Sequence, residues 1–475
     1  MLVLSQASTR EKTEMTGPHI LVIPFPAQGH VIPLLELSHR LVKHGLRVTF
    51  VSTDHVHKRI INALQEKNHV GDDQEISLVS ISDGLEPWED RNDLGKLCES
   101  LVKVMPGKLE EIIKEINNKE EGGKITCVIA DVHVGVTLEV AEKLKIKGAA
   151  FMPMAAAALA LYYHVPKMIN DGIINKDGTS IERQMIKLGE NMPAISSANL
   201  IWNIGDLFTQ RSIFQLIAKC TEGTQMAADY LICNTTYELE TEAFNVVPKI
   251  IPIGPLLASN REGNSAGHFW PEDSSCLAWL DQQEPNSVAY VAFGSFTVLD
   301  KTQFQELALG LELTNKPFLW VVRPDITDDA NEAYPEGFTE RVANRGKMVG
   351  WAPQQKVLSH PSIACFMSHC GWNSTMEGVS NGLPFLCWPY FADQFINETY
   401  IADIWMVGLK FNKDENGIIS REEIKRKVDQ VLGDENFKAR ASELQEFALK
   451  STKEGGPSNQ NFKKFIDWLR AWEVD

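Results

Sequence analysis

Short apolar runs rich in β-branched residues alternate along this chain with amphipathic segments of helical period, and this alternation limits the possible folds more than any other feature. Continuous apolar strands separated by helices predict parallel sheets that helices cover on both faces. Because crossovers between parallel strands are right-handed, the pattern predicts doubly wound α/β domains. The predicted strands are 19–25, 47–53, 125–130, 148–152 and 230–234, then 288–293, 318–322, 347–350, 364–367 and 384–388.

The length of 475 residues is too great for one ordinary core, so two domains of roughly 200 residues each are expected. The stretch 257–275 is rich in Ser, Asn, Gly and Glu and has the composition of a linker. It separates an N-terminal domain, 18–256, from a C-terminal domain, 276–455. The polar start of the chain, 1–17, is expected to be a disordered tail. Two similar halves that face each other place the ligand cleft between them.

The last segment, 456–475, carries an apolar stripe with helical spacing. We therefore expect an amphipathic helix that packs back across the domain junction, toward the N-terminal domain. The stripe consists of Phe462, Phe465, Ile466 and Leu469.

Acidic residues outnumber basic residues by 63 to 46, so the formal net charge is −17. This charge argues against nucleic acid as a partner and suits anionic membrane surfaces poorly. The longest apolar stretch, 148–163, is interrupted by Pro153 and is shorter than a membrane helix of roughly 20 residues, so no integral membrane association is expected. The eight cysteines form no Cys-x-x-Cys pair and no signal peptide is evident, which predicts a cytoplasmic protein with free thiols. A monomer is expected.

Residues that follow strands are the first candidates for a site, because ligands of open α/β sheets bind beyond the carboxyl ends of the strands. His30 lies between the first strand and a helical pattern that starts at Pro33, where a neutral imidazole can accept a proton. Asp131 follows strand 125–130 and can orient such an imidazole and stabilise its protonated form. Each has an ordinary alternative, since His30 can be a surface loop residue and Asp131 a helix N-cap.

The strand 364–367 leads into Ser368-His369-Cys370-Gly371-Trp372-Asn373-Ser374, where a helix is predicted to begin. Gly371 permits a close backbone approach, and Asn373 and Ser374 add side-chain donors to the unpaired N–H groups of a helix start. This segment predicts an anion site built from a helix dipole rather than from lysines, which suits an acidic chain. The alternative is a well-capped helix without a ligand.

Further candidates lie after other strands or in the same helix. Glu377, in the next helical turn, can bind a ribose diol, and Trp351 can stack on a base. Asp393 and Gln394 suit sugar hydroxyls, and Ser295 offers a phosphate contact. The alternatives are a solvated helix carboxylate and ordinary loop polarity.

From Trp351 to Gln394 the chain resembles the signature box of the plant secondary-product UDP-glycosyltransferases. The box opens Trp351-Ala352-Pro353-Gln354, continues with His369-Cys370-Gly371-Trp372-Asn373-Ser374 and Glu377, and closes with Asp393-Gln394. The resemblance extends over nearly the whole chain after the tail. Other segments similar to that family are Pro26-Ala27-Gln28-Gly29-His30, Cys233-Asn234-Thr235-Thr236-Tyr237-Glu238-Leu239-Glu240 and Phe293-Gly294-Ser295.

The resemblance implies two facing Rossmann-like domains of GT-B architecture and a metal-independent, inverting transfer from a UDP-sugar. It implies that Trp351 stacks on uracil, that the Ala352 backbone pairs with uracil, and that Gln354 and Glu377 hold the ribose. The residues implied for the diphosphate are Ser295, His369, Asn373 and Ser374, beside Gly371. The residues implied for the sugar are Trp372, Asp393 and Gln394.

The resemblance also implies that His30 is the general base and Asp131 its partner, and that Gln394 at the end of the box favours glucose. No Asp-x-Asp pair occurs in the chain, so the usual carboxylate pair for a divalent cation on a nucleotide sugar is missing. His369 and the helix start would then meet the charge of the leaving UDP. UDP-glucose is the expected co-substrate, without a separate cofactor. His133 has no matching role in the family and is not expected to compete with His30.

The acceptor is expected to be a small apolar phenolic, flavonoid or terpenoid alcohol that binds in the N-terminal domain. Another UDP-sugar as donor, an N- or C-glycoside as product, and a non-catalytic UDP-sugar-binding protein remain open alternatives. The expected pocket residues, which could equally be core, are Trp88, Met152, Met154, Tyr163 and Phe208.

Two other enzyme classes fit less well. The segment Gly378-Val379-Ser380-Asn381-Gly382 matches the hydrolase motif G-x-S-x-G, but a helix is predicted before Ser380 and a strand after it, the reverse of a nucleophile elbow. A dinucleotide oxidoreductase needs G-x-G-x-x-G after the first strand, where this chain has only Gly29.

Overall fold

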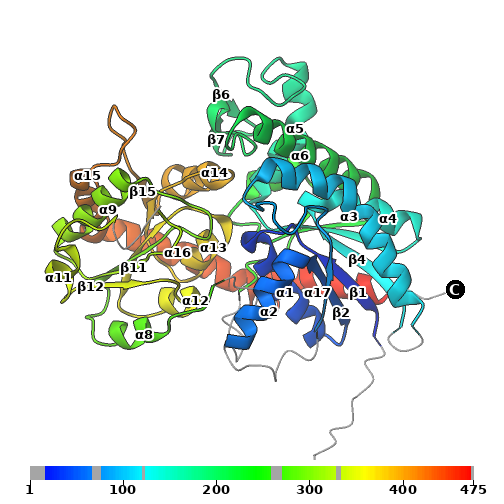
Figure 1. Ribbon diagram of the computed structural model, residues 1–475, viewed down its shortest axis with the longest axis horizontal. Helices are drawn as coiled ribbons and strands as arrows, with labels where there is room; N and C mark the ends of the chain where they lie inside the picture. Colours follow the sequence, from blue (N-terminus) through cyan, green and yellow to red (C-terminus); the bar gives the residue numbers. More distant parts are fainter. Residues whose placement is uncertain (1–16, 67–75, 120–122, 258–269, 328–332, 472–475) are drawn as a thin grey trace, which may run out of the picture.

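Two parallel sheets, one in each half of the chain, form the framework of the protein (Figure 1). The computed structural model describes residues 17–66, 76–119, 123–257, 270–327 and 333–471. Residues 1–16 of the predicted tail and 258–269 of the predicted linker therefore lie outside the described residues. The fold class is confirmed, because the described residues form two Rossmann-like α/β domains.

The first sheet has the strand order β3-β2-β1-β4-β5-β8-β9, and all of its pairings are parallel. Its strands are β1 (His19–Ile23), β2 (Arg47–Thr53), β3 (Ile76–Ile81), β4 (Ile125–Asp131), β5 (Lys147–Met152), β8 (Tyr230–Cys233) and β9 (Ile250–Pro252). Its helical segments are α1 (Gln28–Lys43), α2 (Asp54–Glu66), α3 (Leu94–Asn117), η1 (Val132–Thr137), α4 (Leu138–Lys143), α5 (Ala156–Asn170), η2 (Ser197–Asn199), α6 (Leu207–Ala227) and α7 (Thr241–Val246). A small antiparallel hairpin, β6 (Met185–Lys187) and β7 (Ala194–Ser196), is inserted between α5 and α6.

The second sheet has the order β12-β11-β10-β13-β14-β15 and is also parallel throughout. Its strands are β10 (Val288–Ala292), β11 (Phe318–Val321), β12 (Gly346–Val349), β13 (Ile363–Ser368), β14 (Phe385–Cys387) and β15 (Gly408–Lys410). Its helices are α8 (Ser275–Leu280), α9 (Lys301–Thr314), α11 (Phe338–Val342), α12 (Gln354–Leu358), α13 (Trp372–Ser380), α14 (Gln394–Thr399), the π-helical η4 (Tyr400–Ile404), α15 (Arg421–Gly433) and α16 (Glu435–Thr452).

The strand order reverses at one point in each sheet, between β1 and β4 in the first and between β10 and β13 in the second. Such reversal points open a crevice at the carboxyl ends of the two strands, because the crossovers on either side lead away to opposite faces. The segments that follow β1, β4, β10 and β13 are therefore placed to form a site.

All ten predicted strands are present, with ends that differ by one or two residues. The prediction missed three strands at sheet edges, β3, β9 and β15, and the two strands of the small hairpin, β6 and β7. The strands β9 and β15 have three residues each, which is too short for a periodic signal, and β3 has only partly buried residues at its centre.

The last helix, α17 (Pro457–Arg470), packs against the first sheet, as expected (Figure 1, red). Its apolar stripe joins the core formed by the α1 face of that sheet, and Phe465 contacts the ring of Tyr230 at 5.2 Å between centroids. Polar contacts at both ends of the helix add to this, from Asn461 to the Pro252 carbonyl and from Arg470 to the His44 carbonyl. None of the helices in the described ranges combines the length and apolar composition needed to cross a bilayer.

We expect Phe465→Ala to lower the free energy of unfolding by about 3–5 kcal/mol, because Phe465 is fully buried and the substitution leaves a cavity. Phe447→Ala on α16 is the matched control, since that ring is 48% exposed and its loss should change stability little. Denaturant unfolding of both variants checks this. Equal, small effects would show that α17 is only loosely attached to the N-terminal domain.

Candidate active site

A cavity lies between the carboxyl ends of the two sheets, with lining residues from both domains. All residues of the predicted donor site line it, which brings together segments that follow several different strands of the second sheet. His30 lines the same cavity, whereas Asp131 is completely buried behind it. The lining donor residues are Ser295, Trp351, Ala352, Gln354, His369, Gly371, Trp372, Asn373, Ser374, Glu377, Asp393 and Gln394.

His30 occupies the first turn of α1, because that helix begins at Gln28 and not at Pro33 as predicted. Its Nδ1 lies 2.7 Å from Oδ2 of Asp131, the last residue of β4. The strands β1 and β4 are neighbours, so their carboxyl ends bring the two residues together. A carboxylate only accepts hydrogen bonds, so Nδ1 of His30 carries the proton and Nε2 has a free lone pair. This arrangement can accept a proton from a hydroxyl group in the cavity.

Asp131 makes more contacts than an N-cap alone would require. Its Oδ1 accepts hydrogen bonds from the backbone N–H of His133 and from His133 Nδ1, both at 2.9 Å. Burial, the largest influence, would raise the pKa of Asp131, but the attraction of His30 and the hydrogen bonds from His133 and His30 hold the pKa below its ordinary value. Asp131 thus caps the start of η1 and also hydrogen-bonds to His30.

His30, Asp131 and His133 are also the one group of three potential metal ligands among the described residues, with ligand atoms within 4.8 Å of one another. Their Nδ1 and carboxylate atoms are already joined by hydrogen bonds. In this arrangement the Nδ1 protons of the two histidines lie in hydrogen bonds to the Asp131 carboxylate.

In the turn that leads into α13, backbone segments pack closely against the His369 ring. A Cβ atom at Gly371 or Gly294 would lie 2.5 Å from Nε2 of His369, so only glycine fits on either side of that imidazole. Burial, and secondarily the charge of Arg323, lower the pKa of His369 to about 4. His369 is therefore neutral at physiological pH, and a ring nitrogen that carries its proton can donate to a phosphate oxygen.

No lysine or arginine is among the described residues that line the cavity. A cation lies behind the lining instead, because Arg323 is only 1% exposed. Its guanidinium donates to the carbonyl of Gly294, to the carbonyl of Thr297 at 2.8 Å and to Asp325 Oδ1 at 2.9 Å. Arg323 thus holds the turn of Ser295 in place and adds positive potential to a site in an acidic protein.

Glu377 is held by two amides from the start of α12. Gln354 Nε2 donates to Oε2 at 2.6 Å and Gln355 Nε2 to Oε1 at 3.0 Å. Gln354 also donates to the Ser374 hydroxyl at 2.8 Å, which ties α12 to α13. Burial raises the pKa of Glu377 to about 7, against the opposing effect of the two amides. Glu377 is thus a buried carboxyl with neutral partners, and not a solvated helix residue.

Asp393 and Gln394 lie at the start of α14 on the opposite side of α13. Asn397 Nδ2 donates to Asp393 Oδ2 at 2.8 Å and to the Cys370 carbonyl at 2.9 Å, which links this pair to the His369 turn. Burial raises the pKa of Asp393 to about 6. The Gln394 carbonyl oxygen accepts the backbone N–H of Tyr390 at 2.7 Å, so the orientation of its amide is fixed.

Asn373 joins the two domains through a carbonyl group that a proline leaves free. Within α1, Pro33 has no N–H to donate to the carbonyl of Gly29, four residues earlier. Asn373 Nδ2 donates to that carbonyl at 2.7 Å. The side chain predicted to contact phosphate therefore also positions α13 against the helix that carries His30.

The apolar part of the cavity differs from the predicted pocket. Of the predicted pocket residues only Met154 lines it, and Tyr162 takes the place expected for Tyr163. Trp88 is 80% exposed and Met152 is fully buried in the core. The missed lining residues come mainly from the segment after β1, from α3, from the segment before α6 and from α6 itself: Phe25, Leu94, Cys98, His133, Ile201, Ile204, Ile213, Leu216 and Ile217.

The missed residues carried little sequence signal, because lining and core residues are both apolar. His133 is the exception, since a polar ring directly after a strand end is the signal that singled out His30 and Asp131. Ser380, the serine of the G-x-S-x-G segment, ends α13 and precedes β14, and it does not line the cavity.

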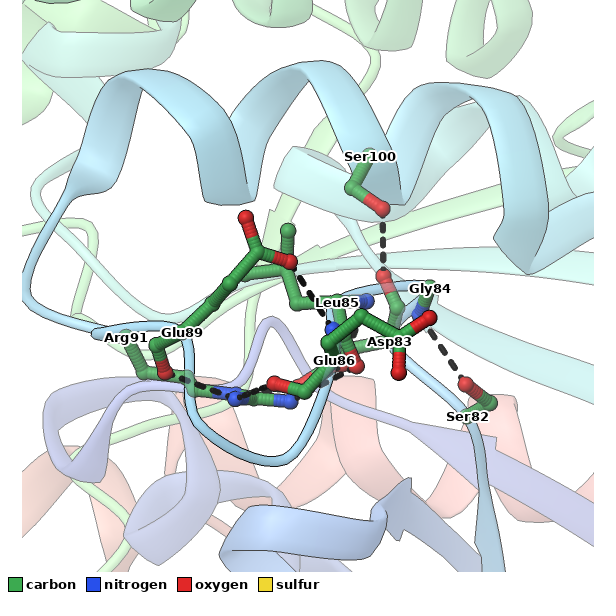
Figure 2. A network of polar contacts seen from close by, with 8 residues as sticks. All are labelled: Ser82, Asp83, Gly84, Leu85, Glu86, Glu89, Arg91 and Ser100. Carbon is green, nitrogen blue, oxygen red and sulfur yellow. Dashed lines mark hydrogen bonds and ion pairs between the residues drawn. The ribbon is translucent and has the colours of Figure 1, made fainter.

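Figure 2 shows the loop between β3 and α3, which is organised by one arginine. All five guanidinium N–H groups of Arg91 are used. Two bind the carboxylate of Asp83 at 3.0 and 3.1 Å, and three bind the carbonyls of Leu85, Glu86 and Glu89 at 2.6–3.0 Å. The hydroxyl of Ser100, on α3, donates to the Asp83 carbonyl at 2.7 Å. The loop is thus fastened to the helix whose Leu94 and Cys98 line the cavity.

Two protein-family models and a plant relative match this chain. A family model described as UDP-glucoronosyl and UDP-glucosyl transferase matches residues 255–449, and a glycosyltransferase N-terminal domain model matches residues 19–83. UDP-glycosyltransferase 83A1 of Arabidopsis thaliana is 45% identical over 467 residues, which covers 96% of this chain and 98% of that relative.

Two solved structures resemble the whole chain. A UDP-glucosyltransferase from Polygonum tinctorium capable of glucosylating indoxyl, in complex with 3,4-dichloroaniline, has a TM-score of 0.81 at 26% identity and covers 96% of this chain and 99% of that chain. UGT2 of Phytolacca americana, complexed with UDP-2fluoro-glucose and pterostilbene, has a TM-score of 0.78 at 25% identity and covers 95% and 99%.

We expect Glu377→Ala to weaken UDP binding on the order of 10- to 100-fold, because a buried hydrogen-bonding carboxyl group is removed from the cavity. Glu446→Ala, on an exposed face of α16, is the matched control. Calorimetric titration of UDP into both variants checks this. Unchanged UDP affinity in Glu377→Ala would show that Glu377 only ties α12 to α13.

We expect Arg91→Lys to raise the acceptor KM about 10-fold with UDP affinity unchanged, because an ammonium group cannot replace five planar donors. Steady-state kinetics with varied acceptor and saturating donor measure this. Arg183→Ala, an exposed arginine outside the cavity lining, should leave both constants unchanged. An equal rise in both KM values would assign Arg91 a general structural role instead.

Proposed function

Because this chain belongs to the plant UDP-glycosyltransferase family, we propose that it transfers glucose from UDP-glucose to a hydroxyl group of a small hydrophobic acceptor, with inversion and without a metal. Membership of this family makes the protein a glycosyltransferase that uses a UDP-sugar. One observation carries the finer proposal: His30 is held by Asp131 at 2.7 Å and lines the same cavity as all the predicted donor-site residues.

In the proposed donor complex, Trp351 stacks on uracil and the Ala352 backbone pairs with it, while Gln354 and Glu377 bind the ribose. Both oxygens of Glu377 accept amide hydrogen bonds in the structure, so ribose hydroxyls would replace one of these amides. The free N–H groups at the start of α13 would bind the diphosphate, together with His369 and the side chains of Ser295, Asn373 and Ser374.

The proposed reaction is a single displacement. Nε2 of His30 takes the proton of the acceptor hydroxyl, and the oxygen forms a bond to the anomeric carbon from the side opposite UDP. The bond between the anomeric carbon and the phosphate oxygen breaks, and UDP leaves with that electron pair. Asp131 stabilises the imidazolium that forms, while His369 and the α13 start stabilise the charge on UDP. The chain has no Asp-x-Asp pair, which supports a metal-independent route.

Glucose is the proposed sugar because Gln394 closes the box and its amide is held in one orientation beside Asp393. The glucosylating enzyme of Polygonum tinctorium and the UDP-2fluoro-glucose complex of Phytolacca americana UGT2 agree with this proposal. The lining around His30 is apolar and without lysine or arginine among the described residues, which favours an uncharged phenolic, flavonoid or terpenoid acceptor. We also propose a cytoplasmic location.

We expect UDP-glucose and a panel of phenols, flavonoids and terpenoid alcohols to give a product with the mass increment of one hexose, in the presence of EDTA. His30→Ala should lower the rate by ~10²–10⁴ while UDP binding is kept, because the proton acceptor is lost. His360→Ala is the control, since that histidine lies outside the cavity lining. Mass spectrometry of the products and calorimetric titration with UDP provide the measurements.

Three outcomes would contradict parts of this proposal. Near-normal turnover of His30→Ala would refute the role of the base, and a strict need for added Mg²⁺ or Mn²⁺ would refute the metal-free route. Product from another UDP-sugar but not from UDP-glucose would refute the donor preference.

A further inference from the structure

We propose that His133 is a positioning residue for the transfer reaction, which holds the Asp131 carboxylate in the orientation that His30 needs. This inference rests on the proposed role of His30 as base. It assigns a role to a histidine that the sequence analysis did not expect to take part.

The side-chain contacts of Asp131 are divided between the two histidines, and its Oδ2 also accepts the backbone N–H of Phe25 at 3.4 Å. Oδ2 faces His30 Nδ1 at 2.7 Å, and Oδ1 faces His133 Nδ1 at 2.9 Å. The two imidazole rings are perpendicular, at 89°, with centroids 4.8 Å apart. Rotation of the carboxylate about its bond to Cβ would disturb both contacts at once, so His133 restrains the oxygen that His30 uses.

The hydrogen-bond network gives the two rings the same tautomer but different surroundings at Nε2. Asp131 is ionised and can only accept, so both Nδ1 atoms are donors. Tyr162 lies 2.9 Å from His133 Nε2 and donates its hydroxyl proton to it, because a neutral ring that donates through Nδ1 has its acceptor at Nε2. His133 Nε2 is therefore occupied, and among the two histidines His30 alone has Nε2 available for an acceptor hydroxyl.

The electrostatics keep His133 a neutral donor. Its burial lowers the pKa of its imidazole, the hydrogen bond and charge of Asp131 oppose this, and His30 lowers the pKa further. The groups that face it are Asp131 from β4, His30 from α1, Tyr162 from α5 and Cys220 from α6, whose thiol donates to the His133 carbonyl at 3.2 Å. Burial raises the pKa of the Tyr162 hydroxyl well above its ordinary value, so it stays protonated.

The hydrogen bonds from His133 affect the ionisation of the Asp131 carboxylate during the reaction. A buried carboxylate with one partner would tend to take a proton, whereas two additional N–H donors from His133 keep it ionised. Asp131 can then stabilise the His30 imidazolium without accepting its proton. Because His133 and Tyr162 both line the cavity, the same network forms the wall next to the base.

The test compares His133→Leu, which removes the side-chain donor, with His133→Asn, whose amide can take the place of Nδ1. We expect His133→Leu to lower kcat on the order of 10- to 100-fold with the KM for UDP-glucose unchanged, since one hydrogen bond to a charged group is lost. His133→Asn should restore most of that loss. In His133→Leu the pH at which kcat/KM reaches half of its plateau should rise, because a less-bonded Asp131 carboxylate holds the proton on His30 more strongly.

Two further variants separate positioning from a structural effect. His164→Leu, on α5 but outside the lining, is the matched control and should leave kcat unchanged. In an Asp131→Asn background, His133→Leu should cause little further loss, since a residue that acts through Asp131 has no effect once the carboxylate is gone. If His133→Leu folds poorly, Tyr162→Phe replaces it, with a loss in the same direction and a smaller size.

The outcomes distinguish this inference from the proposed function. An inactive His30→Ala together with a fully active His133→Leu would overturn the inference and leave the base assignment in place. A large loss in His133→Leu with an active His30→Ala would make His133 the base and overturn both. Equal losses in His133→Leu and His133→Asn, with an unshifted pH profile and a lower Tm in both, would reduce His133 to a packing residue.

Discussion

Two hydrogen bonds between the domains meet at the start of α13, and the geometry of the cavity depends on them. The indole N–H of Trp372 donates to the Asn234 carbonyl at 2.8 Å, and Asn373 Nδ2 donates to the Gly29 carbonyl at 2.7 Å. Trp372 and Asn373 form the first turn of α13, while Gly29 is in the first turn of α1. These bonds set the start of α13 opposite the helix that carries His30. The separation between the proposed base and the proposed donor residues is therefore a property of the domain junction.

The cavity is notable for carboxyl groups that are buried among neutral partners. Glu377 is held by two glutamine amides and Asp393 by an asparagine amide, and burial raises the pKa of both. Glu240, under the start of α5, accepts two backbone N–H groups and has its pKa raised to about 7 by burial. Asp131 differs because its partners are histidines, which hold its pKa down. Of these four carboxyls it is the one kept ionised by its surroundings, which suits a group that must stabilise a transient imidazolium.

The sequence pattern predicted the architecture well and the local geometry less well. The ten apolar runs all became strands, and the last helix packs where its stripe indicated, because burial on one or both faces leaves a direct trace in residue spacing. The start of α1 was misplaced, since Pro33 reads as a helix start although the backbone is already helical at Gln28. Trp88 was expected in the pocket on account of its size and is instead on the surface, because apolar character alone does not distinguish a lining residue from a surface or core residue.

By itself the sequence determined two doubly wound domains and the placement of His30 and Asp131 after predicted strands, while its resemblance to the plant UDP-glycosyltransferases supplied the full list of predicted donor residues. The domains follow from local periodicity, and the two site candidates follow from the rule that ligands bind beyond the carboxyl ends of parallel strands. The tertiary structure alone decided which distant side chains meet. It joined Gln354 to Glu377, Asn373 to the carbonyl left free by Pro33, and His133 to the carboxylate that His30 uses. Such pairings depend on domain orientation and on side-chain direction, and neither of these leaves a period in the sequence.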